Sequence, residues 1–141
     1  ISPSISVIKN LHHNNNKIIS ILDTQFENNF AKEYFKEYSS KTIYCSVLDN
    51  GNLTEEFKLI LKEIIDSENI NIIHCGGSDI LTYKIIQSVD ESIKFSCCNN
   101  DKMNCGEGIC SSCTSSGNNG IKRLCKIQMD PRDLFENKEF I

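Results

Sequence analysis

Four cysteines lie close together in a part of the chain that has few aliphatic side chains. Residues 99–120 are mostly Asn, Asp, Gly, Ser and Cys, and such a segment cannot bury enough apolar surface to fold around a core of its own. It needs a cross-link to stay folded, which nearby cysteines can supply: Cys105, Cys110, Cys113 and Cys125. We therefore predict a cysteine-rich lobe at residues 99–141, separated near residues 98–102 from a module at residues 1–98.

The module at residues 1–98 alternates between short apolar runs and amphipathic segments. The run KIISIL at residues 17–22 is typical of a buried strand. Residues 54–66 are expected to turn one helical face inward, made of Phe57, Ile60, Leu61, Ile64 and Ile65. Continuous apolar strands that alternate with helices indicate an α/β fold, a parallel sheet with helices on both faces. The expected strands are residues 17–22, 42–48, 70–75 and 93–98, and the expected helices are residues 2–11, 27–38, 54–66 and 78–88.

Local signals refine this prediction. Ser2 or Ser4 can cap the first helix and Thr54 the third, because hydroxyl oxygens accept hydrogen bonds from free N–H groups at a helix start. The segment 49–51, Asp-Asn-Gly, predicts a turn. The second helix is expected to bury one face made of Phe30, Ala31, Tyr34, Phe35 and Tyr38.

Composition excludes several classes of protein. Hydrophobic residues make up 39% of the 141 residues, which argues against a disordered chain. The formal net charge of −4 shows no excess of positive charge of the kind that indicates binding to nucleic acid or to an anionic membrane. No apolar run approaches the roughly 18 residues of a spanning helix, and no signal peptide pattern is present. We therefore predict a cytoplasmic protein whose cysteines bind metal more readily than they form disulfides.

The spacing of the four clustered cysteines indicates the kind of metal centre. It is C-x4-C-x2-C-x11-C, and plant-type [2Fe–2S] proteins use C-x4-C-x2-C followed by a distant cysteine. Gly106 and Gly108 would let the loop bend and bring amide N–H groups to the sulfurs. The fourth thiolate is expected to come from a returning strand at residues 122–129.

Two other interpretations of the cysteines are open. Structural zinc sites favour paired C-x2–4-C knuckles, and here a single C-x2-C pair is present; a disulfide framework is the other possibility. Cys97 and Cys98 have no place in the set of four, and Cys45 and Cys75 lie in apolar runs where a buried thiol is the usual outcome.

Longer segments carry a resemblance to a known family. The stretch FSCCNNDKMNCGEGICSSC at residues 95–113 and the return at residues 124–126 resemble the cluster loop of the dihydroorotate dehydrogenase electron-transfer subunit. The remainder resembles the NAD(P)-binding half of the ferredoxin reductase family. Residues 1–4 are similar to the end of its glycine-rich turn, and residues 74–78 are similar to its Cys-Gly-Pro loop.

The resemblance implies nucleotide contacts. Ser2, Pro3 and Ser4 would face the cofactor pyrophosphate at a helix start; the ordinary alternative is a Ser/Pro helix cap. The other implied nucleotide residues are Cys75, Gly76, Gly77 and Ser78, near the nicotinamide. For these, a buried thiol and a strand-to-helix turn are the alternatives.

Asp23 and Thr24 are nucleotide candidates on a separate ground. They follow the first strand, where nucleotide-binding sheets read the adenosine ribose and an acid suits NAD over NADP. A turn is the alternative role. His12, His13 and His74 show no ligand spacing; the first two are expected in a solvated loop and the third packed in a strand.

The sequence departs from the family at several points. Gly77 stands where the family usually has Pro, and the first strand, its glycines and the flavin-binding barrel are missing. We therefore expect a piece of a longer protein that binds FAD poorly without that barrel.

The expected function is electron transfer between NAD(P)H, flavin and a [2Fe–2S] cluster. The partner would be a flavin-containing catalytic subunit of the dihydroorotate dehydrogenase type, and no residue of the chain would do acid–base catalysis. The alternatives are another reductase of the sulfide dehydrogenase or NADH:ferredoxin type, a redox-sensing nucleotide-binding module, and a zinc-stapled interaction domain.

Overall fold

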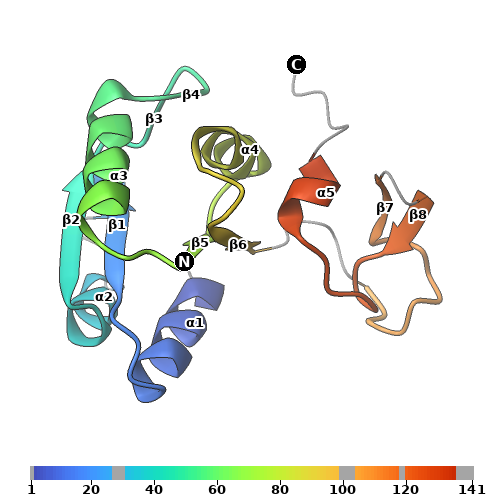
Figure 1. The fold of residues 1–141 in the computed structure, drawn as a ribbon. Helices are drawn as coiled ribbons and strands as arrows, with labels where there is room; N and C mark the ends of the chain where they lie inside the picture. Colours follow the sequence, from blue (N-terminus) through green and yellow to red (C-terminus); the bar gives the residue numbers. More distant parts are fainter. Residues whose placement is uncertain (1, 27–30, 99–103, 118–119, 136–141) are drawn as a thin grey trace. The chain divides into compact units, whose positions relative to one another are not determined.

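The computed structural model describes residues 2–26, 31–98, 104–117 and 120–135 (Figure 1). The chain divides into two compact units, Ile1–Asn71 and Ile72–Ile141. The expected boundary near residues 98–102 lies within the second unit, partly outside the described residues. The assignment of residues 1–98 and 99–141 to two modules stays a prediction.

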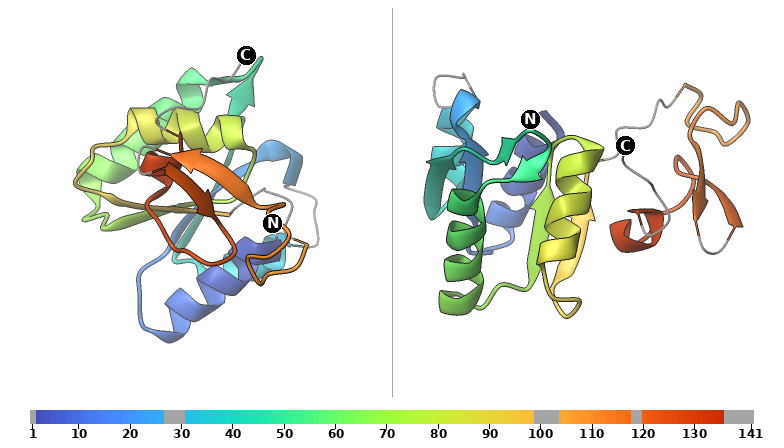
Figure 2. Two further views of the ribbon diagram at one scale, coloured as in Figure 1. Left: turned by 90° about the vertical axis from the view of Figure 1, so that its right-hand side faces the viewer. Right: turned by 90° about the horizontal axis from the view of Figure 1, so that it is seen from above.

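The first unit contains a parallel strand pair flanked by helices. Its elements are α1 (Ser2–His13), β1 (Ile19–Asp23), the 3-10 turn η1 (Thr24–Phe26), α2 (Lys32–Tyr38), β2 (Lys41–Cys45), β3 (Leu48–Asp49), β4 (Asn52–Leu53) and α3 (Glu55–Ser67). Strands β1 and β2 run parallel, with Ile19 opposite Lys41 and Asp23 opposite Cys45. Helix α3 lies beside this pair (Figure 2), where Ile60 lines the same surface hollow as Ile19.

Helices α1 and α2 share a small core with β1. Ile8, Ala31 and Phe35 are buried there, and partly buried neighbours complete it: Ile5, Ile18, Leu22 and Tyr38. The expected burial of Tyr34 is wrong, because its side chain is 37% exposed and its ring lies 4.8 Å from Lys9 Nζ. Phe30 lies outside the described residues.

The beginnings of the helices test the expected caps. Thr54 is the N-cap of α3, as predicted, and its hydroxyl accepts a 3.2 Å hydrogen bond from the N–H of Phe57. Helix α1 already includes Ser2, so the expected cap at Ser2 or Ser4 is wrong; the cap position falls on residue 1, outside the described residues. Both serines lie in the first turn of α1 together with Pro3. Proline suits this turn because it has no backbone N–H that would be left without a partner at the helix start.

Thr54→Val is expected to destabilise the first unit by about 1 kcal/mol, since the substitution keeps the side-chain shape but removes the capping hydroxyl. Urea denaturation followed by circular dichroism measures the change. Thr54→Ser is the matched control, because it keeps an acceptor for the N–H of Phe57. A Thr54→Val chain as stable as the wild type would contradict this role of the cap.

A short antiparallel hairpin follows β2. Asn50 and Gly51 have φ angles of 47° and 77°, which suit a tight two-residue turn that joins antiparallel strands. The predicted turn is therefore confirmed. The expected strand at residues 42–48 ends earlier, at Cys45, because the chain leaves the parallel pair and Leu48 pairs instead with Leu53.

The second unit contains another parallel pair and a second hairpin. Its elements are β5 (Ile72–Cys75), α4 (Asp79–Ser88), β6 (Lys94–Cys97), β7 (Thr114–Gly117), β8 (Gly120–Arg123) and α5 (Pro131–Phe135). Strands β5 and β6 run parallel, with His74 opposite Ser96 and Cys75 opposite Cys97. Strands β7 and β8 are antiparallel.

The predicted order of helices and strands through residue 97 is confirmed, and the fold is mixed α/β. The prediction of a single parallel sheet is not confirmed for the described strands. They form separate pairs, β1 with β2 and β5 with β6, and two further pairs are antiparallel. Both antiparallel pairs are local hairpins, which alternating apolar runs do not signal. The expected returning strand at residues 122–129 instead ends at Arg123.

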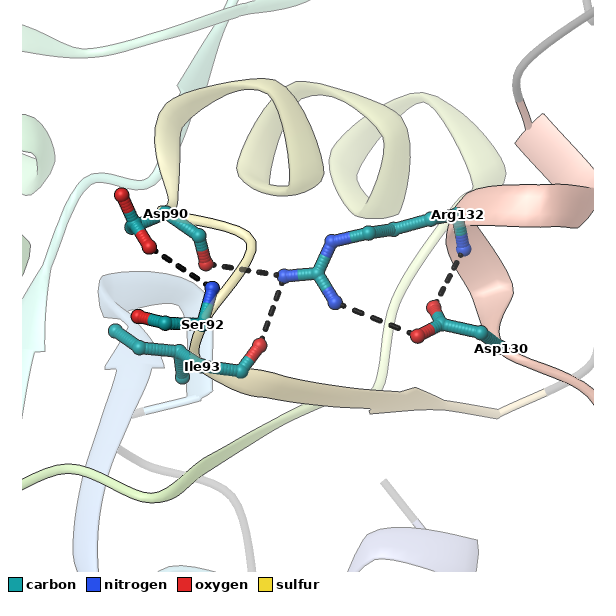
Figure 3. Close-up of polar contacts among 5 residues, drawn as sticks. All are labelled: Asp90, Ser92, Ile93, Asp130 and Arg132. Atoms are coloured by element: carbon teal, nitrogen blue, oxygen red, sulfur yellow. Dashed lines mark hydrogen bonds and ion pairs between the residues drawn. The ribbon is translucent and has the colours of Figure 1, made fainter.

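Arg132 of α5 is fixed against the end of the turn before β6 (Figure 3). Its Nη2 donates to the backbone oxygens of Ile93 at 2.8 Å and Asp90 at 3.3 Å, and its Nη1 lies 3.5 Å from an oxygen of Asp130. Its guanidinium also lies 5.7 Å from the ring centroid of Phe95. One side chain therefore attaches the segment after the cysteines to the β5–α4–β6 layer.

Candidate functional site

The hairpin of β7 and β8 brings together two separate cysteine segments. Cys113 directly precedes β7 and Cys125 lies two residues after β8. The N–H of Leu124 donates to the oxygen of Cys113 at 3.0 Å, which extends the hairpin toward the cysteines. The side chains of Cys113 and Cys125 are hydrogen-bonded to each other. The predicted first-loop and fourth-ligand segments therefore meet.

The loop between Cys105 and Cys113 turns repeatedly through left-handed backbone conformations. Gly106, Gly108 and Ser111 have φ angles of 66°, 72° and 60°. A Cβ on Gly108 would lie 3.0 Å from Cγ of Lys126, so both the conformation and the close approach favour glycine. The left-handed turns that the sequence predicted at Gly106 and Gly108 are therefore confirmed.

Backbone amides hydrogen-bond to the sulfurs. The pKa of Cys105 is lowered to about 6, chiefly by the N–H of Cys110 and then by that of Glu107, whose nitrogen lies 3.3 Å from the sulfur. The pKa of Cys113 is lowered, first by the backbone of Cys125, whereas the pKa of Cys125 is raised, first by its side-chain hydrogen bond with Cys113. Amide donors around cysteine sulfurs are the feature that tunes iron–sulfur centres.

The four thiols have the donor chemistry of a four-cysteine cluster but are not gathered at one point. Hydrogen bonding links the side chains of Cys105 and Cys110 and those of Cys113 and Cys125, and Cys105 also acts electrostatically on Cys113 and Cys125. Among the described residues, no group of three or more His, Cys, Asp or Glu side chains is arranged to hold a metal ion. Four thiols with convergent amide donors are still the chemistry that a [2Fe–2S] cluster requires, and Lys126 and Glu107 close the loop with a 3.0 Å ion pair.

The reactivity of the thiols gives a testable contrast. In the iron-free chain at pH 7, Cys105 is expected to be mostly thiolate and to react rapidly with iodoacetamide, because its pKa lies near 6. Cys97 is expected to stay protonated and to react slowly, since burial first of all raises its pKa to about 11. Peptide mass spectrometry after timed alkylation at pH 6, 7 and 8 measures both rates. Equal rates at Cys97 and Cys105 would contradict the contrast.

The implied nucleotide residues of the first unit have structural partners. Ser4 is buried in the first turn of α1. Asp23 ends β1, and its two carboxylate oxygens accept hydrogen bonds from the N–H groups of Val47 at 3.2 Å and Gln25 at 3.1 Å. Thr24 is exposed at the start of η1. Asp23 therefore holds the ends of β1 and β2 together, and its role toward a ribose stays a prediction.

The implied residues of the second unit form a strand-to-helix turn. Cys75 is 5% exposed, and its sulfur accepts a 3.5 Å hydrogen bond from Thr82. Ser78 caps α4 by accepting from the N–H of Leu81, and a Cβ on Gly77 would lie 2.5 Å from a methyl carbon of Leu81. These observations agree with the buried thiol and helix-start alternatives for this loop. Its contact with a nicotinamide stays a prediction.

Sequence reasoning missed a second group of reactive side chains. His74, expected as a packed strand residue, contacts Ser96 across the parallel pair and Cys98 beyond it. The cysteine pair at residues 97–98 was the available signal, but finding its partner required the register of β5 against β6.

A scan against protein-family models and a search of curated proteins both returned no match. Within the described residues, no helix has the length and apolar character that crossing a bilayer demands.

Proposed function

We propose that this chain is an electron-transfer subunit that holds a [2Fe–2S] cluster through Cys105, Cys110, Cys113 and Cys125. The observation that carries the proposal is that the β7–β8 hairpin brings Cys125 beside Cys113, the last cysteine of the loop, with backbone amides that hydrogen-bond to the sulfurs. When bound, the cluster would supply reversible one-electron transfer.

The chain's own residues would set the environment of that centre. The amides of Glu107, Ile109 and Cys110 donate toward the sulfur of Cys105, which stabilises negative charge on the thiolate. Ile109 and Ile121 are 80% and 76% exposed. They would give the lobe apolar contact surface for a partner protein, since exposed aliphatic groups favour association.

The wider assignment follows the family resemblance. NAD(P)H would bind at the carboxyl ends of the parallel strands, flavin would be held mainly by a domain outside this chain, and the partner would be a dihydroorotate dehydrogenase-type catalytic subunit of pyrimidine biosynthesis. All eight cysteines are free thiols, which favours the reducing environment of the cytoplasm.

Zinc is the second candidate for the same thiols. The arrangement of the sulfurs as two pairs favours it, because structural zinc sites are commonly built from two pairs of cysteines. A zinc-stapled lobe would serve as an interaction domain without electron transfer.

Anaerobic preparation followed by iron, zinc and acid-labile sulfide analysis separates these functions. The proposal predicts about two iron and two sulfide per chain, with visible absorption that bleaches on reduction by dithionite. A colourless chain that contains only zinc would overturn the proposal in favour of the interaction domain. If the chain does contain iron and sulfide, an NADH oxidation assay with an added flavin domain and partner enzyme would distinguish a dihydroorotate dehydrogenase-type subunit from the other reductases.

A further inference from the structure

Three side chains meet on one face of the β5–β6 pair. His74 Nδ1 lies 2.9 Å from the hydroxyl of Ser96, its in-register partner on β6. His74 Nε2 lies 3.6 Å from the sulfur of Cys98. The N–H of Cys98 donates to the oxygen of Cys75 at 3.0 Å and continues the strand ladder. Alternation along the strand therefore places Cys98 on the same face as Ser96.

The two contacts of His74 are compatible with a ring that acts as a base toward Cys98. Burial lowers the pKa of His74, so the imidazole is neutral at pH 7 and carries a single N–H. One of the two tautomers that satisfy both neighbours has its hydrogen on Nδ1, which donates to Ser96. The lone pair of Nε2 then faces the Cys98 thiol, in the position of a base that can accept its proton.

The other cysteines at this edge have different surroundings. Cys75 and Cys97 are paired in register on the opposite face of the strands. Cys75 is buried against Thr82, and burial raises the pKa of both thiols. Cys98 is half-buried and has the imidazole beside it. Cys98, His74 and Ser96 are therefore linked as a nucleophile, a base and a hydroxyl that orients the base. This is the arrangement that activates a thiol.

We propose that Cys98 is a nucleophilic thiol that exchanges with small-molecule disulfides, with His74 as its general base and Ser96 as a positioning residue. This inference does not depend on the iron–sulfur proposal. The Cys98 S–H proton passes to Nε2, and the thiolate attacks one sulfur of R–S–S–R. The S–S bond of the reagent breaks as Cys98–S–S–R forms, and the departing thiolate takes the proton from the imidazolium to leave as RSH.

Thiol–disulfide exchange suits the groups that are present. It requires a thiolate of adequate nucleophilicity and a carrier for the proton, which Cys98 and His74 provide. A carbonyl substrate would also require donors aimed at a developing oxyanion. The exchange is redox-balanced, because the disulfide of the reagent becomes a mixed disulfide on the protein.

The test uses the full chain, purified anaerobically, and 2-hydroxyethyl disulfide as the probe. Timed samples are acid-quenched, and tandem mass spectrometry locates the mixed disulfide at Cys97 or Cys98. Cys98 is expected to be modified about ten times faster than Cys97 or more. His74→Gln is expected to slow modification of Cys98 by about 100-fold, the lower end of the contribution of general acid–base catalysis.

Matched variants separate chemistry from structure. Cys97→Ser should leave the rate at Cys98 unchanged, and Ser96→Thr should stay within about twofold of the wild type because it keeps a hydroxyl. Ser96→Ala should slow the exchange to an intermediate rate. Equal modification of Cys97 and Cys98, or a wild-type rate in folded His74→Gln, would overturn the proposal. If His74→Gln does not fold, a wild-type rate in Ser96→Ala overturns it instead.

Discussion

Replacing Cys110 by Ala is expected to remove the visible absorption and most of the iron from the anaerobically prepared chain. A [2Fe–2S] centre of this class uses four cysteine thiolates, and Cys110 is one of the proposed four. Its side chain is exposed, so the substitution leaves no cavity in a core. The backbone N–H of Cys110 that donates to Cys105 is retained. Loss of the centre would therefore report a lost ligand and not a collapsed loop.

Cys97→Ala is the matched control for this experiment. It removes one thiol from the same unit, but Cys97 lies at the end of β6 and outside the proposed ligand set. We expect this variant to keep the iron, the sulfide and the absorption of the wild type. A Cys110→Ala chain that keeps all three, or a Cys97→Ala chain that loses them, would contradict the ligand assignment.

The parts of the fold that sequence predicted correctly depend on neighbouring residues. Thr54 caps its helix through the N–H group three positions ahead, and Asn50-Gly51 forms a turn through its own backbone preferences. Such features need no knowledge of distant segments, so local patterns suffice to find them.

The features that sequence missed depend on which strands pair and in which register. The carboxylate of Asp23 accepts a hydrogen bond from the N–H of Val47, which is 24 positions away. His74 contacts Ser96 because the register of β5 and β6 places these two residues opposite each other. The β3–β4 hairpin adds two strands within the alternation of strand and helix on which the parallel-sheet prediction was based. For the candidate centre, spacing predicts the four cysteines, whereas the hydrogen bonds between Cys105 and Cys110 and between Cys113 and Cys125 follow from the path of the loop.

Arg132→Met is expected to destabilise the second unit by about 2–3 kcal/mol, since a charged donor is lost from the backbone oxygens of Ile93 and Asp90. The guanidinium bonds to Ile93 and Asp90 and is only 18% exposed, whereas Met fills similar space without donors. Urea denaturation measures the loss. Lys94→Met, which removes an exposed cation from the adjacent position, should change stability by less than about 0.5 kcal/mol. Equal stability of both variants would show that Arg132 does not anchor α5. A large loss confined to Arg132→Met would show that packing of α5 against the start of β6 depends on this one side chain.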